Sequence, residues 1–454
     1  MATRARPVAE ELAERVQGLH GDLPAAVRET CERLLVDVAG LCLVARHRDY
    51  VKAALAGFGE AGPATAIGHR RPVSAGAAAF VNGTAAHGED YDDTFEGGPV
   101  HAGAVVVPAV LAAAELEGAS GSSVLRGLAV GVEILCRLSL VVPKAVHQAG
   151  FHPTAVFGAP AAAAAVASTL RLEMSELVDA LGISGSMASG IIEYLAEGTW
   201  TKRMHPGWAA HSGLRAALLG RAGFKGPRTV FEGTHGLFHG FARTREGDYA
   251  ALLDGFGERW VTPSLAFKPY PCGTMIQPYI DCARRLRERV STPGDIAGIV
   301  AEVAEGTVHR LWEPLEDKQR PPNGYAAKFA TPYCIAAAIL RGHLGLDAFG
   351  DEAVADPEIR ALAAKVSYRI DPANPYPREF TGHLRARLAD GSIVEERQPH
   401  LRGGAREPLT GSDIEEKFRA NARAGGFPDD RVEAALQALR VLFDGTVDLE
   451  DLRG

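Results

Sequence analysis

Cysteine and aromatic residues are scarce in this sequence, and their scarcity narrows the kinds of protein it can be. Six cysteines occur in 454 residues, and none forms a Cys-x-x-Cys pair: Cys31, Cys42, Cys136, Cys272, Cys282 and Cys334. Their spacing argues against a zinc ribbon and against a secreted disulfide framework, and it favours a reducing cytoplasm. Aromatic residues make up only 7% of the chain. Alanine and glycine are abundant instead, so we expect helices that pack closely through small side chains.

Positive charge is also in short supply. The 48 Lys and Arg residues are outnumbered by 56 Asp and Glu, which gives a formal net charge of −8. A nucleic-acid partner therefore has no electrostatic support, because such binding relies on a basic surface that neutralises phosphates.

One long stretch lacks charge altogether. Residues 145–170 contain no Asp, Glu, Lys or Arg, which is long enough to cross a bilayer. However, His152 and Pro153 would break a span near its start, and the apolar part is mainly alanine, which transfers weakly into lipid. We therefore predict a buried helix in a soluble protein, and no membrane partner.

The length allows two domains, and the pattern changes after Trp260. Up to that point, apolar residues recur at helical spacing between Gly and Pro breaks. Helices are predicted at residues 27–44, 77–87, 105–116, 122–142, 160–170 and 174–189, and from about Pro206 to Arg221. We expect residues 1–265 to form a helical domain on which the helices of 405–454 pack back.

Residues 266–404 combine strands with helices. Strands are predicted at 299–303 and 365–371, and Asp390-Gly391 favours a type I′ turn between strands at 383–388 and 392–397. Helices are expected at 277–289 and 327–344. In the tail, residues 412–415 match a capping box, and 432–443 are amphipathic. The predicted fold class is mainly α, with a smaller α+β domain.

A glycine motif at 57–62 (GFGEAG) matches the GxGxxG pattern of dinucleotide sites. Such a site needs a strand before the glycines and a helix after them, so that backbone amides meet the pyrophosphate. Here a predicted helix precedes the motif and a strand-like segment follows it. We therefore interpret it as a glycine-rich helix exit, and the sequence has no phosphate-loop, HExxH or GxSxG motif either.

The densest polar cluster spans residues 82–94 and ends with His101. On a continued helix, His87, Asp90, Asp93 and Thr94 would share one face. Three interpretations stay open here. Four acids within five residues are typical of a solvated helix end. Carboxylates with His also suit Mn, Mg or Fe. The third possibility is a catalytic loop in which an Asp orients a reacting group.

Further histidines and lysines lie in distinctive surroundings. His152 opens the uncharged helix, where the dipole favours a neutral imidazole and attracts anions. Lys202 and His205 belong to a short segment with three basic residues and two tryptophans, and Lys268 lies on a turn framed by prolines. Lysines held in this way are candidates for binding anions.

Four strings together resemble the MmgE/PrpD superfamily, which includes dehydratases, decarboxylases and an epimerase. They are residues 150–158, 198–213 (GTWTKRMHPGWAAHSG), 268–272 (KPYPC) and 326–336 (AAKFATPYCIA). The resemblance covers nearly the whole chain. It implies a large helical domain, a smaller α+β lid and an active site between them. It also implies a homodimer that uses no metal and no organic cofactor.

Matched residue by residue, the resemblance implies a site made of seven residues: Asp90, Thr94, His101, His152, Lys202, Lys268 and Tyr333. It also shows one departure. Relatives commonly carry a histidine at the position of Gly273 or of Gln277, and glutamine can hydrogen-bond but cannot shuttle a proton near neutral pH. We therefore place Gln277 among the substrate-binding residues, with Asp90, Thr94, Lys202 and Lys268.

Two lysines and two histidines that converge in an acidic protein would suit a substrate with two or three carboxylates. We expect Lys202 and Lys268 to bind those carboxylates, His101 to transfer the proton, and His152 to polarise a substrate oxygen, with Tyr333 as a further candidate. The predicted activity is that of a cofactor-independent lyase. It would be a dehydratase of the 2-methylcitrate type or a decarboxylase of the cis-aconitate type. An epimerase acting next to a carboxylate and a non-catalytic carboxylate-binding protein are the alternatives.

Overall fold

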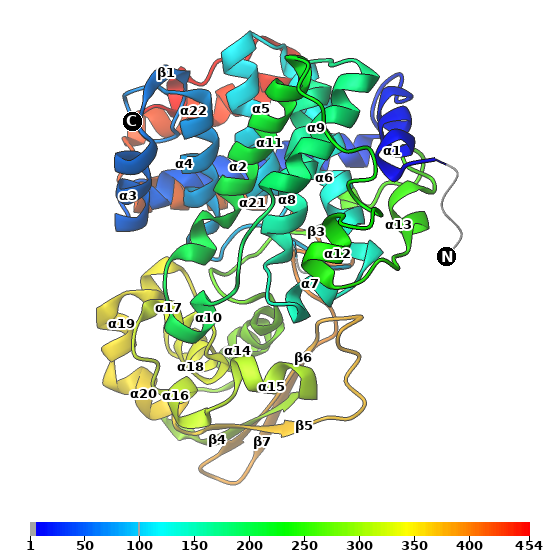
Figure 1. Ribbon diagram of the computed structural model, residues 1–454. Helices are drawn as coiled ribbons and strands as arrows, with labels where there is room; N and C mark the ends of the chain where they lie inside the picture. The colour runs from blue at the N-terminus through cyan, green and yellow to red at the C-terminus, as the bar shows by residue number, and fades with distance from the viewer. Residues whose placement is uncertain (1–5, 99) are drawn as a thin grey trace. The chain divides into compact units, whose positions relative to one another are not determined.

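The computed structural model describes residues 6–98 and 100–454, which fall into two compact units. The first unit runs to Leu265 and also contains Thr410–Gly454, and the second is Ala266–Leu409. The chain is 58% helical and 9% strand. This confirms the predicted fold class, mainly α with a smaller α+β part (Figure 1).

The first unit consists almost entirely of helices. They are α1 (Val8–Gln17), α2 (Ala25–Ala45), α3 (Asp49–Phe58), α4 (Ala75–His87), α5 (Gly103–Glu117), α6 (Gly121–Val141), α7 (Ala145–Gln148), α8 (Pro153–Thr169), α9 (Met174–Met187), α10 (Tyr194–Glu197), α11 (Thr201–Arg221), α12 (Leu237–Ala242), α13 (Tyr249–Leu253), α21 (Gly411–Ala424) and α22 (Asp429–Val441). The short strands β1 (Ala61–Ala64) and β2 (Thr94–Phe95) also belong to it, and β3 (Leu265–Ala266) lies at its boundary.

Two of these helices begin about five or more residues earlier than predicted. The expected starts, at residue 160 and at about Pro206, were based on Pro160 and Pro206, but both prolines lie inside their helices, α8 and α11. Helix α8 instead begins at Pro153, where the absence of a backbone N–H costs nothing because the first helical residues have no intrahelical acceptor.

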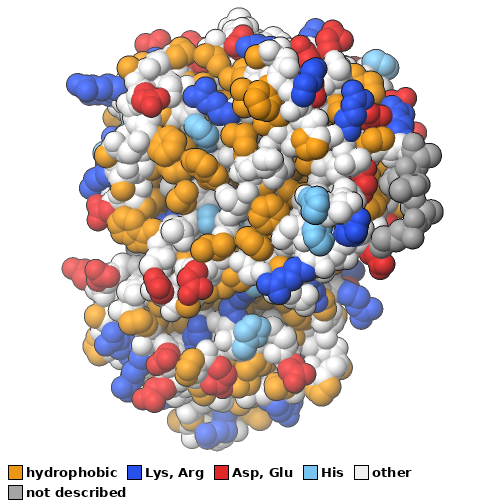
Figure 2. Space-filling view, viewed as in Figure 1, with side chains coloured by type: hydrophobic (Ala, Val, Ile, Leu, Met, Phe, Trp, Pro, Cys, Tyr) orange, Lys and Arg blue, Asp and Glu red, His pale blue; other side chains and the backbone are white. Residues whose placement is uncertain are grey.

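Helix α8 is buried along its whole length and packs against α5, α6, α9 and α11 (Figure 1). This confirms that the uncharged stretch contains a buried helix. Among residues 6–98 and 100–454, no helix is long and apolar enough to cross a membrane. Figure 2 shows that acidic and basic side chains are interspersed over the face in view.

Helices α4 and α11 approach each other through glycine. A Cβ added to Gly83 would lie 2.6 Å from the Cα of Gly207, so neither position has room for a side chain. This contact agrees with the expectation of close packing through small residues. The glycine motif at 57–62 also has the predicted order of helix and then strand, because α3 ends within it at Phe58 and β1 begins within it at Ala61.

The chain end packs on the first unit through α21, which lies along α2. Its capping box was predicted at residues 412–415, and that prediction was wrong by two residues. The Thr410 hydroxyl accepts from the Asp413 N–H at 3.1 Å, and the Asp413 carboxylate accepts from the Thr410 N–H at 2.7 Å. Ser412 therefore lies within the first helical turn.

The second unit has a four-stranded sheet in the order β5-β4-β6-β7. Its strands are β4 (Ile296–Val303), β5 (Val366–Ile370), β6 (Gly382–Leu388) and β7 (Ile393–Gln398), and its helices are α14 (Gln277–Arg289), α15 (Glu305–Leu311), α16 (Leu315–Gln319), α17 (Gly324–Ala327), α18 (Thr331–Arg341), α19 (Asp351–Ala355) and α20 (Pro357–Ala363). Strand β4 runs parallel to β5 and antiparallel to β6.

All four strands were predicted, but the type I′ turn was wrong. Such a turn needs a positive φ at both Asp390 and Gly391, and only Gly391 has one, at +85°. The Gly391 N–H donates to the Leu388 carbonyl at 3.0 Å, so the hairpin turns over residues 388–391. The single helix expected at 327–344 is interrupted, since α17 ends at Ala327 and α18 begins at Thr331. Pro332 explains the break, because it has no N–H to donate to the carbonyl of Lys328 four residues earlier, whereas a proline is tolerated in the first turn of a new helix.

Candidate functional site

The acidic block after α4 is buried. Helix α4 ends at His87, so the residues that follow do not continue on one helical face, as the spacing had suggested. Glu89, Asp90, Asp92 and Asp93 retain only 7%, 3%, 0% and 0% of their exposure, so the interpretation as a solvated helix end was wrong. Asp90 has a φ of +54°, a conformation that an L-residue adopts at some cost.

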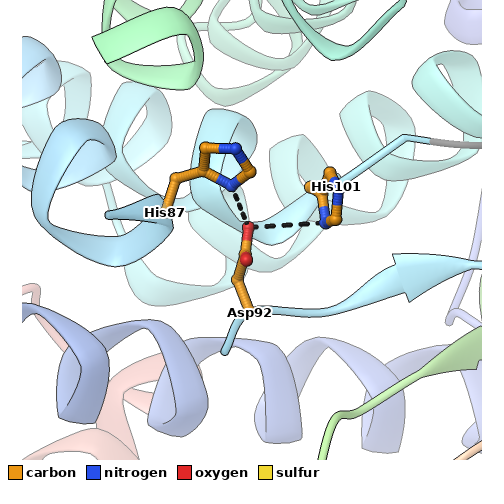
Figure 3. Close-up of side chains that lie close together, drawn as sticks. All are labelled: His87, Asp92 and His101. Atoms are coloured by element: carbon orange, nitrogen blue, oxygen red, sulfur yellow. Dashed lines mark hydrogen bonds and ion pairs between the residues drawn. The ribbon is translucent and has the colours of Figure 1, made fainter. Parts of the chain in front are cut away.

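Asp92 lies between two imidazoles (Figure 3). Its Oδ2 accepts from His87 Nδ1 at 2.7 Å and lies 3.6 Å from His101 Nδ1. The His101 Nδ1 atom is also 2.6 Å from the backbone carbonyl oxygen of Asp93. Since a carbonyl oxygen only accepts, His101 carries a proton on Nδ1, and in the neutral form of such a ring the lone pair is on Nε2.

His87, Asp92 and His101 are also the group that could hold a metal ion within the described residues. The arrangement does not favour coordination. The Nδ1 atoms of both rings point at oxygen acceptors, so coordination through His101 Nδ1 would displace the proton that it donates to the Asp93 carbonyl. The three side chains instead resemble a carboxylate that orients two imidazoles.

Asp93 fixes the start of α5. Its two carboxylate oxygens accept from the backbone N–H groups of Ala102 and Gly103, each at 2.9 Å. Burial, together with the neighbouring Asp92 carboxylate, raises the pKa of Asp93 to about 8, while the two backbone bonds favour its charged form. These bonds tie the loop that carries His101 to the acidic block.

His152 directly precedes α8, and its ring lies among other imidazoles. Its Nδ1 atom is 3.2 Å from His205 Nδ1, and its ring centre is 5.7 Å from that of His87. Burial lowers the pKa of His152 well below its usual value, and nearby His205, His87 and Lys202 lower it further. The ring is therefore neutral, as expected at a helix N-terminus, and supplies no positive charge in the resting protein.

Lys202 is on the first turn of α11, and its ammonium pairs with the Asp90 carboxylate. The lysine is 8% exposed and Asp90 is 3% exposed, so this is a buried ion pair. Positive charge near the histidines is thus partly neutralised already. The first unit brings together Asp90, His101, His152 and Lys202, and Thr94 is buried on β2.

The other predicted site residues lie in the second unit. Lys268 is buried, with 2% of its surface exposed. The Gln277 amide stabilises the turn that follows Lys268. Its Nε2 donates to the carbonyl oxygens of Tyr270 and Cys272, and its Oε1 accepts from the Tyr270 N–H. Tyr333 is fully buried, burial raises its pKa, and its hydroxyl donates to the Ala348 carbonyl at 2.6 Å.

The geometry adds three residues that were not among the predicted site residues: His87, Asp92 and His205. His87 and Asp92 belong to the polar cluster of residues 82–94, and the concentration of polar residues there was the signal that could have identified them. Nothing in the sequence indicated that His205 meets His152, because 53 residues separate them.

Comparison with known proteins identifies the family of this chain. Residues 10–250 match the MmgE/PrpD N-terminal domain, and residues 270–442 match the MmgE/PrpD C-terminal domain. The chain is 30% identical to cis-aconitate decarboxylase of Mus musculus, over 81% of this chain and 75% of the relative. It is 27% identical to cis-aconitate decarboxylase of Aspergillus terreus, over 95% and 92%.

A 2-methylcitrate dehydratase of Cupriavidus necator is 26% identical, over 61% of this chain and 59% of the relative. All three relatives are named for carbon–carbon or carbon–oxygen bond cleavage. The chain therefore belongs to the MmgE/PrpD family, and it is an enzyme of the lyase class.

Proposed function

We propose that the protein is a cofactor-independent lyase that acts on a polycarboxylate or a related hydroxy acid. The reaction proceeds by proton transfer at a carbon next to a carboxylate. The observation that carries the proposal is the grouping of the partly buried His101 with the buried His152 and the buried Lys202–Asp90 pair. Relatives named cis-aconitate decarboxylase and 2-methylcitrate dehydratase support the same substrate class.

His101 is the proposed proton-transfer group. Its Nδ1–H donates to the Asp93 carbonyl, so Nε2 offers the lone pair that a general base requires. When Nε2 takes a proton, the resulting imidazolium is stabilised by the Asp92 carboxylate 3.6 Å from Nδ1. This assignment needs no metal ion.

Lys202 is the proposed ligand of a substrate carboxylate. An ammonium has three N–H donors, and the bond to Asp90 uses one of them and fixes the position of Nζ. Lys268 is proposed to bind a second carboxylate, and His152 to polarise a substrate oxygen. Thr94 and Gln277 are retained as proposed substrate-binding residues. The side chains of Gln277 and Tyr333 already bond backbone carbonyls, which argues against a catalytic role for either residue.

The proposed intermediate is a carbanion next to a carboxylate, whose charge the nearby cations stabilise. Loss of hydroxide from it yields an alkene, which is dehydration. Loss of CO2 from the substrate leads to the same carbanion, which is then protonated. Reprotonation on the opposite face would be epimerisation, which is the second candidate.

The experiment is incubation with a panel of di- and tricarboxylates in deuterium oxide, followed by NMR. Net formation of an alkene or of CO2 supports the lyase. Deuterium exchange with inversion and no net conversion favours the epimerase, and binding without exchange favours a non-catalytic carboxylate-binding protein. Exhaustive chelation should leave turnover unchanged. Activity that is lost on chelation and restored by one divalent ion would contradict the metal-free proposal.

The homodimer implied by the family resemblance and the cytoplasmic location favoured by the cysteine pattern are part of the proposal. Light scattering of the purified protein tests the dimer, and a monomer with full activity would contradict it. Fractionation of the producing cells tests the location.

A further inference from the structure

His152 and His205 face each other through the same ring atom. His152 precedes α8, His205 is in the second turn of α11, and their Nδ1 atoms are 3.2 Å apart. The two residues are 5% and 6% exposed. At this distance one Nδ1 carries a proton and the other accepts it, because two lone pairs or two N–H groups would repel.

The rings are neutral near neutral pH. Burial lowers the pKa of His205 to about 4 and that of His152 well below its usual value. A neutral imidazole carries a single N–H, so the proton position on one ring dictates that on the other. If His205 donates, His152 holds its proton on Nε2. If His152 donates, its Nε2 has only a lone pair.

We propose that His205 donates from Nδ1 and thereby holds His152 in the tautomer protonated on Nε2. His205 is then a positioning residue, which acts through His152 and need not touch the substrate. The inference rests on the proposed function, in which His152 polarises a substrate oxygen. Only an Nε2–H group can donate to that oxygen while the ring stays neutral. Outer hydrogen-bond partners fix histidine tautomers in the same way at metal sites.

The tautomer can be measured without substrate. In protein labelled with 15N at histidine, long-range proton–nitrogen correlations distinguish protonated from unprotonated ring nitrogens, and His152→Asn assigns the signals. We expect His152 to be protonated on Nε2 in the wild-type protein. His205→Phe should release the ring and populate the second tautomer. His205→Asn should preserve the wild-type pattern, because its amide nitrogen lies near the position of Nδ1.

Kinetics give the second readout. His205→Phe should lower kcat by about 10- to 100-fold, the usual cost of losing such a partner, and change KM by no more than about threefold. His205→Asn should recover most of the loss. His211→Phe is the control, since His211 is also on α11 but its Nδ1 bonds the Gly76 carbonyl. If His205→Phe fails to fold, His205→Gln, whose amide lies near the position of Nε2, replaces it.

Two results would overturn the inference: a wild-type His152 protonated on Nδ1, or a His152 tautomer that His205→Phe leaves unchanged. Failure of the proposed function is a separate outcome. It would appear as absence of turnover by the wild-type enzyme across the carboxylate panel, whereas the tautomer is observed in the free protein.

Discussion

The ammonium of Lys417 on α21 lies 2.8 Å from the carboxylate of Asp37 on α2, with side-chain exposures of 6% and 0%. The same Nζ donates to the carbonyl oxygen of Tyr91 at 2.8 Å and lies 3.8 Å from the centre of the Tyr91 ring. A helix near the chain end therefore supports the loop that carries Asp90 and Asp92. The support depends on charge as well as on packing.

Replacing Lys417 by Met should lower the free energy of unfolding by about 3–5 kcal/mol, because it leaves the Asp37 carboxylate buried without its counter-ion. The double variant Lys417→Met/Asp37→Asn should recover part of this loss. Urea denaturation measures both. Arg419→Met is the matched control, since its partly exposed pair with Glu433 is worth about 1 kcal/mol or less. Equal losses for the two single variants would contradict the prediction.

Lys202→Ala should raise KM for the carboxylate substrate by about 10- to 100-fold, the value of one or two charge-assisted hydrogen bonds. Part of kcat should also be lost, since the substrate is less well oriented. Steady-state kinetics separate the two effects. Lys225→Ala is the control, because Lys225 is an exposed lysine of the same unit paired with Asp179. A normal KM in the Lys202 variant would exclude the proposed carboxylate contact.

His101→Gln should cost roughly 10²–10⁴ in kcat, the usual share of general acid–base catalysis, and should leave substrate binding largely intact. Single-turnover kinetics and a binding isotherm test the two halves of this prediction. An unchanged kcat would remove His101 as the base. His152 would then be the next candidate, ahead of Tyr333, whose hydroxyl is bound to the Ala348 carbonyl.

The stability of the protein should depend on His205 as pH falls. Burial lowers its pKa from 6.5 to about 4 in the folded state, so between these values the unfolded chain binds the extra proton. The contribution of His205 to stability is thus complete above pH 6.5 and is lost towards pH 4. It should amount to about 3 kcal/mol in total, at about 1.4 kcal/mol per pH unit.

His205→Asn lacks this titration. As the pH falls, the free energy of unfolding of the wild type should therefore decrease more steeply than that of the variant. Denaturation series from about pH 4 to pH 7 measure both. Two parallel series would mean that His205 keeps its ordinary pKa in the folded protein.

The two positions at which relatives carry histidine should respond differently to that residue. Gly273 has a φ of −55°, and an added Cβ would come no closer than 3.4 Å to any neighbour. Gly273→His should therefore keep the free energy of unfolding within about 1 kcal/mol of the wild type. Gln277→His should lose about 2–3 kcal/mol, because an imidazole cannot replace three bonds to the turn.

Chemical denaturation of both variants tests the difference, and equal stabilities would contradict it. The Gly273→His enzyme also shows whether a histidine at this position changes the ratio of dehydration to decarboxylation.

Local patterns were enough to predict most of the fold. Apolar spacing located α2 within two residues at its start and one at its end, and Asp390-Gly391 located the hairpin. The errors arose where the same local sequence pattern is compatible with two different structures. A proline can open a helix or lie within one, and Pro206 does the second. In the same way, Ser412 matched a capping pattern that Thr410 actually uses.

The site was less accessible to sequence analysis, because its contacts join distant residues. The mutual repulsion of the acidic residues suggested that Asp92 and Asp93 are exposed to solvent. In the folded chain, hydrogen bonds make their burial possible: the Ala102 and Gly103 N–H groups donate to Asp93, and His87 donates to Asp92. The neutrality of His152 follows from the rings and the lysine packed around it, which spacing alone does not reveal. The family resemblance named residues, and only the folded chain gave their hydrogen-bond partners.

The glycine contact between α4 and α11 has a consequence for how this site can change over time. Helix α4 ends with His87, and Lys202 lies in the first turn of α11, so each helix carries a part of the site. Where Gly83 meets Gly207, backbone touches backbone, and the separation of the helices does not depend on the size of any side chain. Core residues elsewhere can therefore change in size without altering the separation of the two helices that carry His87 and Lys202.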